Sequence, residues 1–216
     1  MRYRRFTPGL GLALLLAAAC SSTETTEGTS AEAVAKFKQA IEQDYKIDRN
    51  LDAAIEKLEE AIRLEPTYTL CRRDLARLLM ERGLNSVTRT LYNRRSVEEL
   101  TQKLDSNTRP DDEREIRRQI DGLKEQTRQV EESLRNDLNQ SLKHFTVCRR
   151  EWPQDPTIPF YMGHVCAGLE RYEDAREHYT ESLELGNTDD HGRKVIREAI
   201  EALDTAINQR EQLADK

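Results

Sequence analysis

A small–large–small arrangement of side chains recurs three times along this chain and constrains its fold more than any other feature. In each copy a small residue is followed at +4 by a large one, at +7 by a second small one and at +12 by a turn residue. The copies are Ala54–Leu58–Ala61–Pro66, Ser141–Phe145–Cys148–Pro153 and Ala175–Tyr179–Ser182–Asn187. Because positions i, i+4 and i+7 share a helix face, two small side chains there let another helix approach closely. The pattern therefore predicts three helices, each packed against a partner helix.

The spacing of the copies indicates a repeat with one interruption. The second and third copies lie 34 residues apart, whereas the first and second lie 53 residues farther apart than that. This period and pattern resemble the tetratricopeptide repeat (TPR), whose unit is two antiparallel helices. The resemblance is strongest in GLERYEDAREHYTESLEL at residues 168–185, with Gly163 in the preceding helix. Where the family usually has that glycine, the first copy has Glu42 and the middle copy has Ala76.

The extra residues are predicted to form a helical hairpin inserted into the central repeat. Its first helix is expected over about residues 69–82, and the partner of that helix only at about 137–151. Between them, apolar residues spaced three and four apart predict two antiparallel helices with a coiled-coil seam. The seam residues are Leu84, Val87, Leu91, Val97, Leu100 and Leu104, and then Ile116, Ile120, Leu123, Thr127, Val130 and Leu134. A turn is expected at 106–110, and arms of about 20 residues would be roughly 30 Å long.

The last part of the chain is predicted to be a capping helix. Thr188, Asp189 and Asp190 are suitable N-caps, and the residues that follow form an apolar stripe. The stripe contains Val195, Ile196, Ala199, Ile200, Leu203 and Ile207. Such a helix would cover the open end of a repeat stack. We therefore expect an all-α fold: a short TPR-like helical-hairpin solenoid with an inserted antiparallel coiled-coil hairpin and a C-terminal capping helix.

The first twenty residues have the features of a secretion signal. Three arginines precede the apolar run GLGLALLLAAA at residues 9–19, which is too short to span a bilayer core that needs roughly 20 residues. The next residue, Cys20, resembles the modified cysteine of bacterial lipoproteins, although Ala17 stands where the family prefers leucine. The resemblance implies lipidation of Cys20. Because Ser21 is not the aspartate that retains lipoproteins in the inner membrane, it also implies an outer-membrane site facing the periplasm. The alternative is an ordinary signal peptide and a free protein.

This interpretation divides the chain into six segments. They are a signal peptide (1–19), the lipidated cysteine with a flexible tether (20–30), the first repeat with the first helix of the second (31–83), the inserted hairpin (84–134), the second helix of the second repeat with the third repeat (135–187), and the capping helix (188–216).

Charge and motif content argue against several classes of function. The chain has a net charge of −6, and removal of residues 1–19, with three arginines and no acid, lowers it to about −9. Nucleic-acid binding needs positive surface charge, so we expect no nucleic-acid partner. The sequence has no phosphate-binding loop, hydrolase elbow, zinc-protease motif or calcium loop, and its four histidines have no partners at metal-ligand spacing. We therefore expect no catalytic residue, no metal and no cofactor, and membrane contact through the lipid anchor only.

One face of each first helix is expected to line a concave groove. The groove residues are the i, i+4 pairs Gln39 and Gln43, Arg73 and Arg77, and Phe160 and His164, with Lys36 at the rim. The three basic side chains would give an acidic protein a locally positive site for an acidic segment or a C-terminal carboxylate. The TPR subclass that clamps carboxylates uses asparagine and lysine at its groove positions, which this set does not reproduce. The alternative is an ordinary solvated surface.

Three cysteines remain after Cys20, in a compartment that permits disulfides. Cys71 should begin the central repeat's first helix and Cys148 should end its second, so antiparallel packing would bring them together. A Cys71–Cys148 disulfide is one hypothesis, and a Cys148–Cys166 disulfide is its rival. The third alternative is three buried thiols that pack as small apolar residues.

The sequence thus favours a non-enzymatic, lipid-anchored scaffold of the bacterial cell envelope that binds another envelope protein. A second hypothesis is structural: the hairpin would drive self-association, and the chain would act as a coiled-coil spacer anchored to the membrane.

Overall fold

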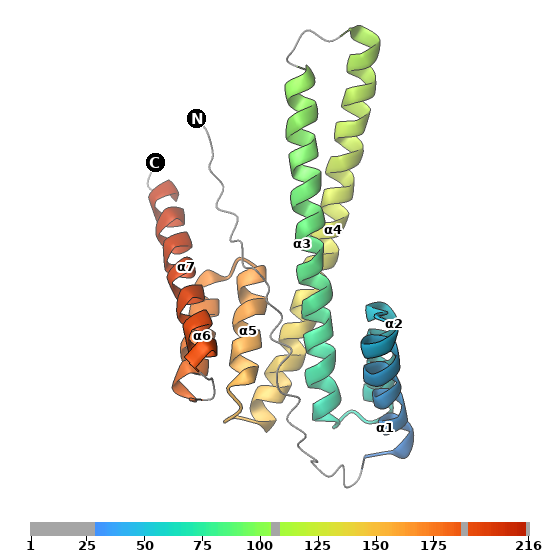
Figure 1. The fold of residues 1–216 in the computed structure, drawn as a ribbon, viewed down its shortest axis with the longest axis vertical. Helices are drawn as coiled ribbons and strands as arrows, with labels where there is room; N and C mark the ends of the chain where they lie inside the picture. Colours follow the sequence, from blue (N-terminus) through green and yellow to red (C-terminus); the bar gives the residue numbers. More distant parts are fainter. Residues whose placement is uncertain (1–28, 105–108, 187–189, 215–216) are drawn as a thin grey trace.

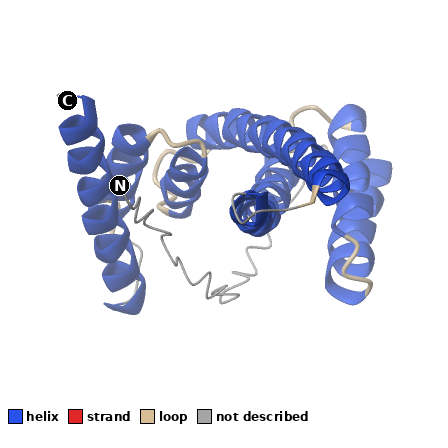
Figure 2. Ribbon diagram, turned by 90° about the horizontal axis from the view of Figure 1, so that it is seen from above, coloured by secondary structure: helices blue, strands red, loops and turns tan. Residues whose placement is uncertain are grey.

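The computed structural model describes residues 29–104, 109–186 and 190–214. Within these ranges the chain is helical without strands, as Figures 1 and 2 show, so the predicted all-α class is confirmed. The helices are α1 (Ala31–Lys38), the π-helix η1 (Gln39–Ile47), α2 (Leu51–Leu64), α3 (Thr69–Leu104), α4 (Pro110–Glu151), α5 (Thr157–Gly168), α6 (Tyr172–Glu184) and α7 (Asp190–Ala214). The predicted signal peptide, Cys20 and most of the predicted tether lie outside the described residues.

Side chains and prolines in the sequence account for several helix ends. The Ser30 hydroxyl accepts a hydrogen bond from Ala33 N–H at the start of α1, and the Asn50 side chain does the same for Ala53 N–H at the start of α2. Each satisfies one of the N–H groups that a helix leaves unpaired at its N-terminus. Pro110 is the first residue of α4, where its missing N–H costs nothing.

The helices follow one another in space in the order of the sequence, from α1 and α2 at one end to α7 at the other (Figure 1). The residues of the three small–large–small copies that lie within helices are all buried, with at most 1% of their surface exposed: Ala54, Leu58, Ala61, Ser141, Phe145, Cys148, Ala175, Tyr179 and Ser182. The sequence pattern therefore marks the faces of α2, α4 and α6 that pack against their neighbours.

The turns beside these helices have matching geometry. After α2, Glu65 N–H donates to Ala61 O and Tyr68 N–H donates to Glu65 O; after α4, Trp152 and Asp155 form the same two bonds with Cys148 and Trp152. Before α2 and α6, Arg49 and Glu170 have positive φ angles of 55° and 60°. Each stands five residues before the first small residue of its copy. Equivalent sequence positions thus adopt equivalent backbone conformations.

The predicted hairpin is formed by α3 and α4, which are each continuous across the predicted segment boundaries at 83/84 and 134/135. Their outer halves lie side by side and project beyond the other helices (Figure 1). At the base, Leu138 packs between two glycines: a Cβ atom at Gly83 would lie 3.0 Å from its Cδ2, and one at Gly168 would lie 2.8 Å from its Cδ1. Most of the predicted turn at 106–110 lies outside the described residues.

The seam of the hairpin agrees with the prediction on α4 and near the tip of α3, but not at Val87 and Leu91. Leu84 at the base of α3 is partly buried against the cluster that contains Leu134 and Leu138. Val97, Leu100 and Leu104 are partly buried. Val87 and Leu91 are instead 36% and 44% exposed, and the prediction for these two was wrong. The positions that face α4 there are Gly83, Ser86, Thr90 and Asn93. Their three- and four-residue spacing continues in phase with the tip residues, because a continuous helix can present only one stripe to its neighbour.

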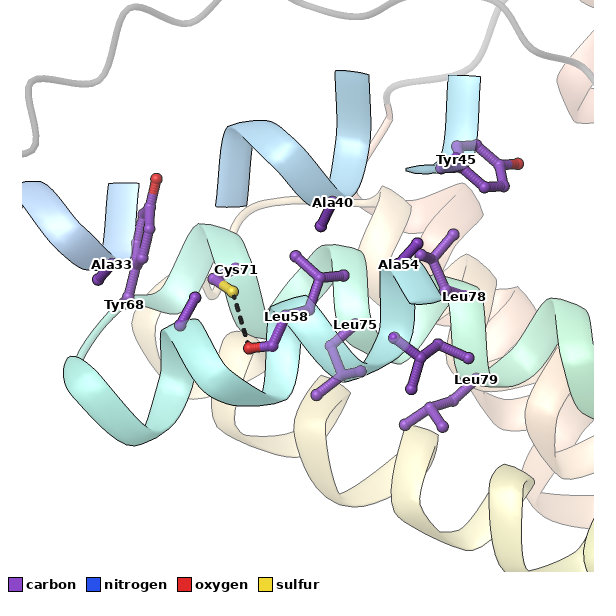
Figure 3. Packing of buried hydrophobic residues seen from close by; sticks show 12 residues of the cluster. Ala33, Ala40, Tyr45, Ala54, Leu58, Tyr68, Cys71, Leu75, Leu78 and Leu79 are labelled. Carbon is purple, nitrogen blue, oxygen red and sulfur yellow. Dashed lines mark hydrogen bonds between the residues drawn. The ribbon is translucent and has the colours of Figure 1, made fainter. Parts of the chain in front are cut away.

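The first pair contains a π-helix that the sequence pattern did not predict. Ala40 and Tyr45 in η1 are both buried, and their five-residue separation matches the wider turn of a π-helix. Glu42, at the position where the repeat that the sequence resembles has glycine, is exposed. Figure 3 shows Ala40 facing the core that α2 and α3 share, which contains Leu58, Leu75, Leu78 and Leu79.

The last helix packs on α6 as a cover, with Ile196, Ala199 and Leu203 buried against Ala175 and Tyr179. An exposed ion pair between Arg176 and Asp204 joins the two helices at 3.1 Å. Asp190 is the first residue of α7 rather than its N-cap, and the other two candidate caps, Thr188 and Asp189, lie outside the described residues.

Candidate functional site

Two arginines of α3 contact aromatic rings from other parts of the chain. The guanidinium carbon of Arg73 lies 5.7 Å from the centre of the Trp152 ring, at the end of α4, and that of Arg77 lies 5.4 Å from the centre of the Tyr45 ring. Both distances are in the range of cation–π contacts. The two guanidiniums therefore lie one turn apart on α3, one against η1 and the other against the end of α4.

Neither arginine is neutralised by a carboxylate from another helix in the described part of the chain. Arg73 has only its sequence neighbour Asp74 at 3.6 Å, with no bidentate contact. Arg77 forms no ion pair among the described residues, and its Nε atom is buried there without a hydrogen-bond partner. A guanidinium in this state can still bind a carboxylate, which would form short, charge-assisted hydrogen bonds with it.

The other predicted groove residues, which lie on α1 and η1, differ in the contacts that they make. The Lys36 ammonium lies 2.6 Å from Glu60 of α2, which raises the lysine pKa. Lys36 therefore forms an ion pair within the chain, rather than presenting an unpaired charge at the edge of the predicted groove. Gln39 and Gln43 are exposed, and Gln43 donates a hydrogen bond to the nearby Asp48 at 2.9 Å.

The predicted groove residues of α5 form part of an aromatic cluster. The His164 ring packs edge-on against Phe160, with centres 4.5 Å apart, and its Nδ1 lies 2.8 Å from the Tyr179 hydroxyl. Burial lowers the pKa of His164 to about 4, because the charged ring would lose its hydration. His164 is thus a neutral packing residue that positions Tyr179, while Phe160 remains partly exposed.

Two aromatic residues that pack against the cluster shared by α3, α4 and α5 were not among the predicted groove residues. Trp152 and Tyr161 are partly buried, and Tyr161 stacks on Phe145 with ring centres 5.6 Å apart. Tryptophan, tyrosine and arginine are the residue types that contribute most to protein–protein binding energy. The signal available in the sequence was the single tryptophan of the chain, placed in the turn that follows the second small–large–small copy.

The cysteines Cys71, Cys148 and Cys166 are free and fully buried in this structure. The ends of α3 and α4 do meet, because the Cys148 thiol lies 3.7 Å from Thr69 O, two residues before Cys71. Burial raises the pKa of Cys71 and Cys148 to about 12, and that of Cys166 to about 11. Such thiols are poor nucleophiles. Both disulfide pairings stay hypotheses for the oxidised protein.

Other kinds of site find no support in the described ranges. No group of three or more histidine, cysteine, aspartate or glutamate side chains there could hold a metal ion. None of the described helices is both long and apolar enough to cross a bilayer. A scan of protein-family models and a search of curated proteins found no match to the chain.

Proposed function

We propose that this protein is a non-enzymatic, lipid-anchored scaffold of the bacterial cell envelope, which binds another envelope protein through the face that carries Arg73 and Arg77. The observation that carries the proposal is the pair of guanidiniums that no carboxylate from another described helix neutralises. Arg73 packs over the Trp152 ring and Arg77 over the Tyr45 ring, on a protein that is acidic overall. This is an arrangement suited to an acidic segment or a C-terminal carboxylate of a partner.

The proposed fold is a TPR-like solenoid with an inserted hairpin and a capping helix. Three features support it: the buried small–large–small copies on α2, α4 and α6, the matching turns after α2 and α4, and the positive φ angles at Arg49 and Glu170. A stack in which each helix pair contacts only its neighbours has much surface for its size, as binding scaffolds require.

The proposed anchor is tested by fractionation of cells that produce the full chain. Wild-type protein should sediment with membranes and carry a mass increase for lipid on its N-terminal peptide. The Cys20→Ser variant should lack that lipid and leave the membrane fraction. Wild-type protein without lipid at Cys20 would contradict the proposed anchor but not the partner-binding face.

The proposed partner is tested by affinity purification from intact cells after chemical crosslinking. Arg73→Gln with Arg77→Gln removes both charges, and Arg114→Gln with Arg118→Gln removes two charges from the exposed outer part of α4 as a control. We expect one co-purified envelope protein to fall at least tenfold in the first variant and to persist in the second. Equal recovery with both variants would overturn the proposed binding face.

A further inference from the structure

Charged residues on the exposed faces of α4 and α6 stand at equivalent positions of two successive small–large–small copies. Lys143 and Arg150 follow the first small residue of the α4 copy by two and nine residues, and Glu177 and Glu184 follow that of the α6 copy by the same two and nine. Seven residues bring two side chains back to one face of a helix, about 10 Å apart. We call Lys143 and Arg150 the basic pair, and Glu177 and Glu184 the acidic pair.

The two pairs are exposed, and their charged groups form no ion pair or hydrogen bond with another described residue. Neighbouring charges on the same helices are paired instead. Arg149 is bonded to Glu181 of α6, and Arg176 of α6 is bonded to Asp204 of α7. The basic and acidic pairs therefore remain able to form ion pairs with another molecule.

The basic pair and the acidic pair lie level with each other and on the same side of the molecule. The bond of Arg149 with Glu181 joins α4 and α6 at residues 32 positions apart. The two pairs are 34 positions apart, so they are level within about 3 Å of helix rise. The opposite faces of the two helices are buried at equivalent positions, Phe145 and Tyr179. Both helices run in the same direction, since α5 runs antiparallel to each of them (Figure 1).

This arrangement of charges is complementary to itself. A second copy, rotated by 180° about an axis parallel to α4 and α6, would place its α6 on the first copy's α4 and its α4 on the first copy's α6. Lys143 would then meet Glu177, and Arg150 would meet Glu184, each 34 positions away. The two-fold symmetry would form both contacts twice. Like charges would not meet on this face, because Thr146 lies between the basic residues.

We propose that this face is a dimer interface, and that its occupant is the same face of a second copy, with the helices of the two copies parallel. In such a dimer both hairpins point the same way. The start of α1 lies at the end opposite the outer part of the hairpin, because Phe37 contacts Tyr68, which directly precedes α3 (Figure 1). Both chains therefore leave the dimer at one end, as two chains anchored in one membrane require.

The dimer rests in part on the proposed lipid anchor. Exposed ion pairs contribute little energy each, so the dimer is weak in dilute solution. An anchor confines the copies to one surface and raises their effective concentration. The interface does not include Arg73 or Arg77, so the proposed partner-binding face and the dimer can fail separately.

The first test reverses charges in the lipid-anchored full chain. Lys143→Glu with Arg150→Glu makes both pairs acidic, and Glu177→Lys with Glu184→Lys makes both basic. The variant with all four changes is complementary again and has the wild-type net charge. Every chain also carries Gln154→Cys, an exposed position after α4, for attachment of donor or acceptor dyes, because the native thiols in the described ranges are buried. Energy transfer between copies is measured in phospholipid vesicles.

We expect energy transfer in the otherwise wild-type chain and at least about threefold less in each double variant, because like charges then oppose one another. Transfer should return in the fourfold variant and in a mixture of the two double variants. Helical circular dichroism should be the same throughout, since the substituted side chains are exposed. Equal transfer in all chains, or a loss without recovery in the fourfold variant, would overturn the proposed dimer.

The second test needs no membrane and so separates the dimer from the proposed anchor. Ordinary and nitrogen-15-labelled full chains are mixed, concentrated in a non-ionic detergent and treated with a carbodiimide, which joins a lysine amine to a carboxylate in direct contact. We expect a crosslink between Lys143 and Glu177 whose two peptides carry different isotopes. Absence of this crosslink, or its occurrence only within one isotope, would overturn the dimer. The crosslink in a chain without lipid would contradict the anchor alone.

Discussion

At the scale of single residues, the closest helix contacts depend on the absence of a side chain. A Cβ atom at Gly163 of α5 would lie 2.7 Å from two carbons of the buried Tyr179 ring on α6, a rigid obstacle. Glycine and tyrosine at these two places belong to the pattern that first indicated the repeat, so sequence reasoning could predict this contact. It could not predict the hydrogen bonds of Arg82 with Asp137 and Asp52, because these residues do not stand at a recurring spacing in the sequence.

Gly163→Ala is expected to destabilise the full chain by about 1–3 kcal/mol, the usual cost of overpacking a core. Gly122→Ala is the matched control, because a Cβ atom there has no neighbour within 4 Å. Alanine at that exposed helical position should stabilise by up to about 1 kcal/mol. Urea unfolding monitored by circular dichroism measures both. Equal shifts in the two variants would argue against the close approach of α5 to Tyr179.

The neutral state of His164 predicts a pH dependence of stability. Its pKa is about 4 in the folded chain and about 6.5 when unfolded. Above about pH 6.5 the ring is neutral in both states, so His164 does not reduce the free energy of unfolding. As the pH falls towards about 4, the unfolded chain takes up a proton that the folded chain does not, and the free energy of unfolding falls by at most about 3 kcal/mol. In His164→Gln, urea unfolding at pH 7, 6, 5 and 4.5 should show a shallower decline than in wild type. Other histidines remain in both chains, so parallel declines would show that His164 titrates normally.

At the scale of elements, the face of α3 that packs on α4 explains what the sequence could and could not predict about the hairpin. The apolar spacing predicts two long helices, and α3 and α4 are continuous as the absence of breakers suggests. It does not predict which of two offset stripes on α3 faces α4, since Val87 and Leu91 are out of phase with Val97. The tip stripe faces α4, and Thr90 and Asn93 follow it inside.

Ion pairs of Arg82 join α3 to α4 and α2 at the base of the hairpin. Arg82 of α3 donates two hydrogen bonds, of 2.9 and 2.7 Å, to Asp137 of α4, whose side chain is 3% exposed, and a third of 2.9 Å to the exposed Asp52. These carboxylates raise the pKa of Arg82. Asp137→Ala should cost about 1–3 kcal/mol, because Arg82 loses two charge-assisted hydrogen bonds but stays partly exposed and bonded to Asp52. Asp52→Ala should cost less than about 1 kcal/mol. Chemical denaturation distinguishes them, and similar losses would contradict the buried geometry.

Replacement of the polar layer inside the hairpin should stabilise it. Thr90 Oγ1 and Asn93 Nδ2 are buried and have no hydrogen-bond partner among the described residues. Thr90→Val and Asn93→Leu together should therefore raise the free energy of unfolding by about 1–3 kcal/mol. The matched control is Thr88→Val on the exposed face, which should change little. A loss of stability in the double variant would show that the polar groups are paired in solution.

At the scale of the whole molecule, the architecture follows from a pattern in which each helix contacts its sequence neighbours. This explains why the sequence predicted the order of the elements well: small and large residues at fixed spacing specify local helix pairs. The π-helix η1 was not predictable from the sequence. The spacing of apolar residues was matched to an α-helix, and a single wider turn does not change that spacing enough to be recognised. The contacts of Arg73 with Trp152 and of Arg77 with Tyr45 were missed because the two rings come from the end of α4 and from η1, and only folding brings them to α3.

The central claim is that the face carrying Arg73 and Arg77 binds a protein partner. The most direct measurement is photo-crosslinking in intact cells, with a photoreactive residue placed at exposed Gln39, one of the predicted groove residues, or at exposed Gln119 on the hairpin. The proposal predicts one discrete adduct with another envelope protein from position 39 and none with that protein from position 119. No adduct from position 39, or the same adduct from both positions, would contradict it.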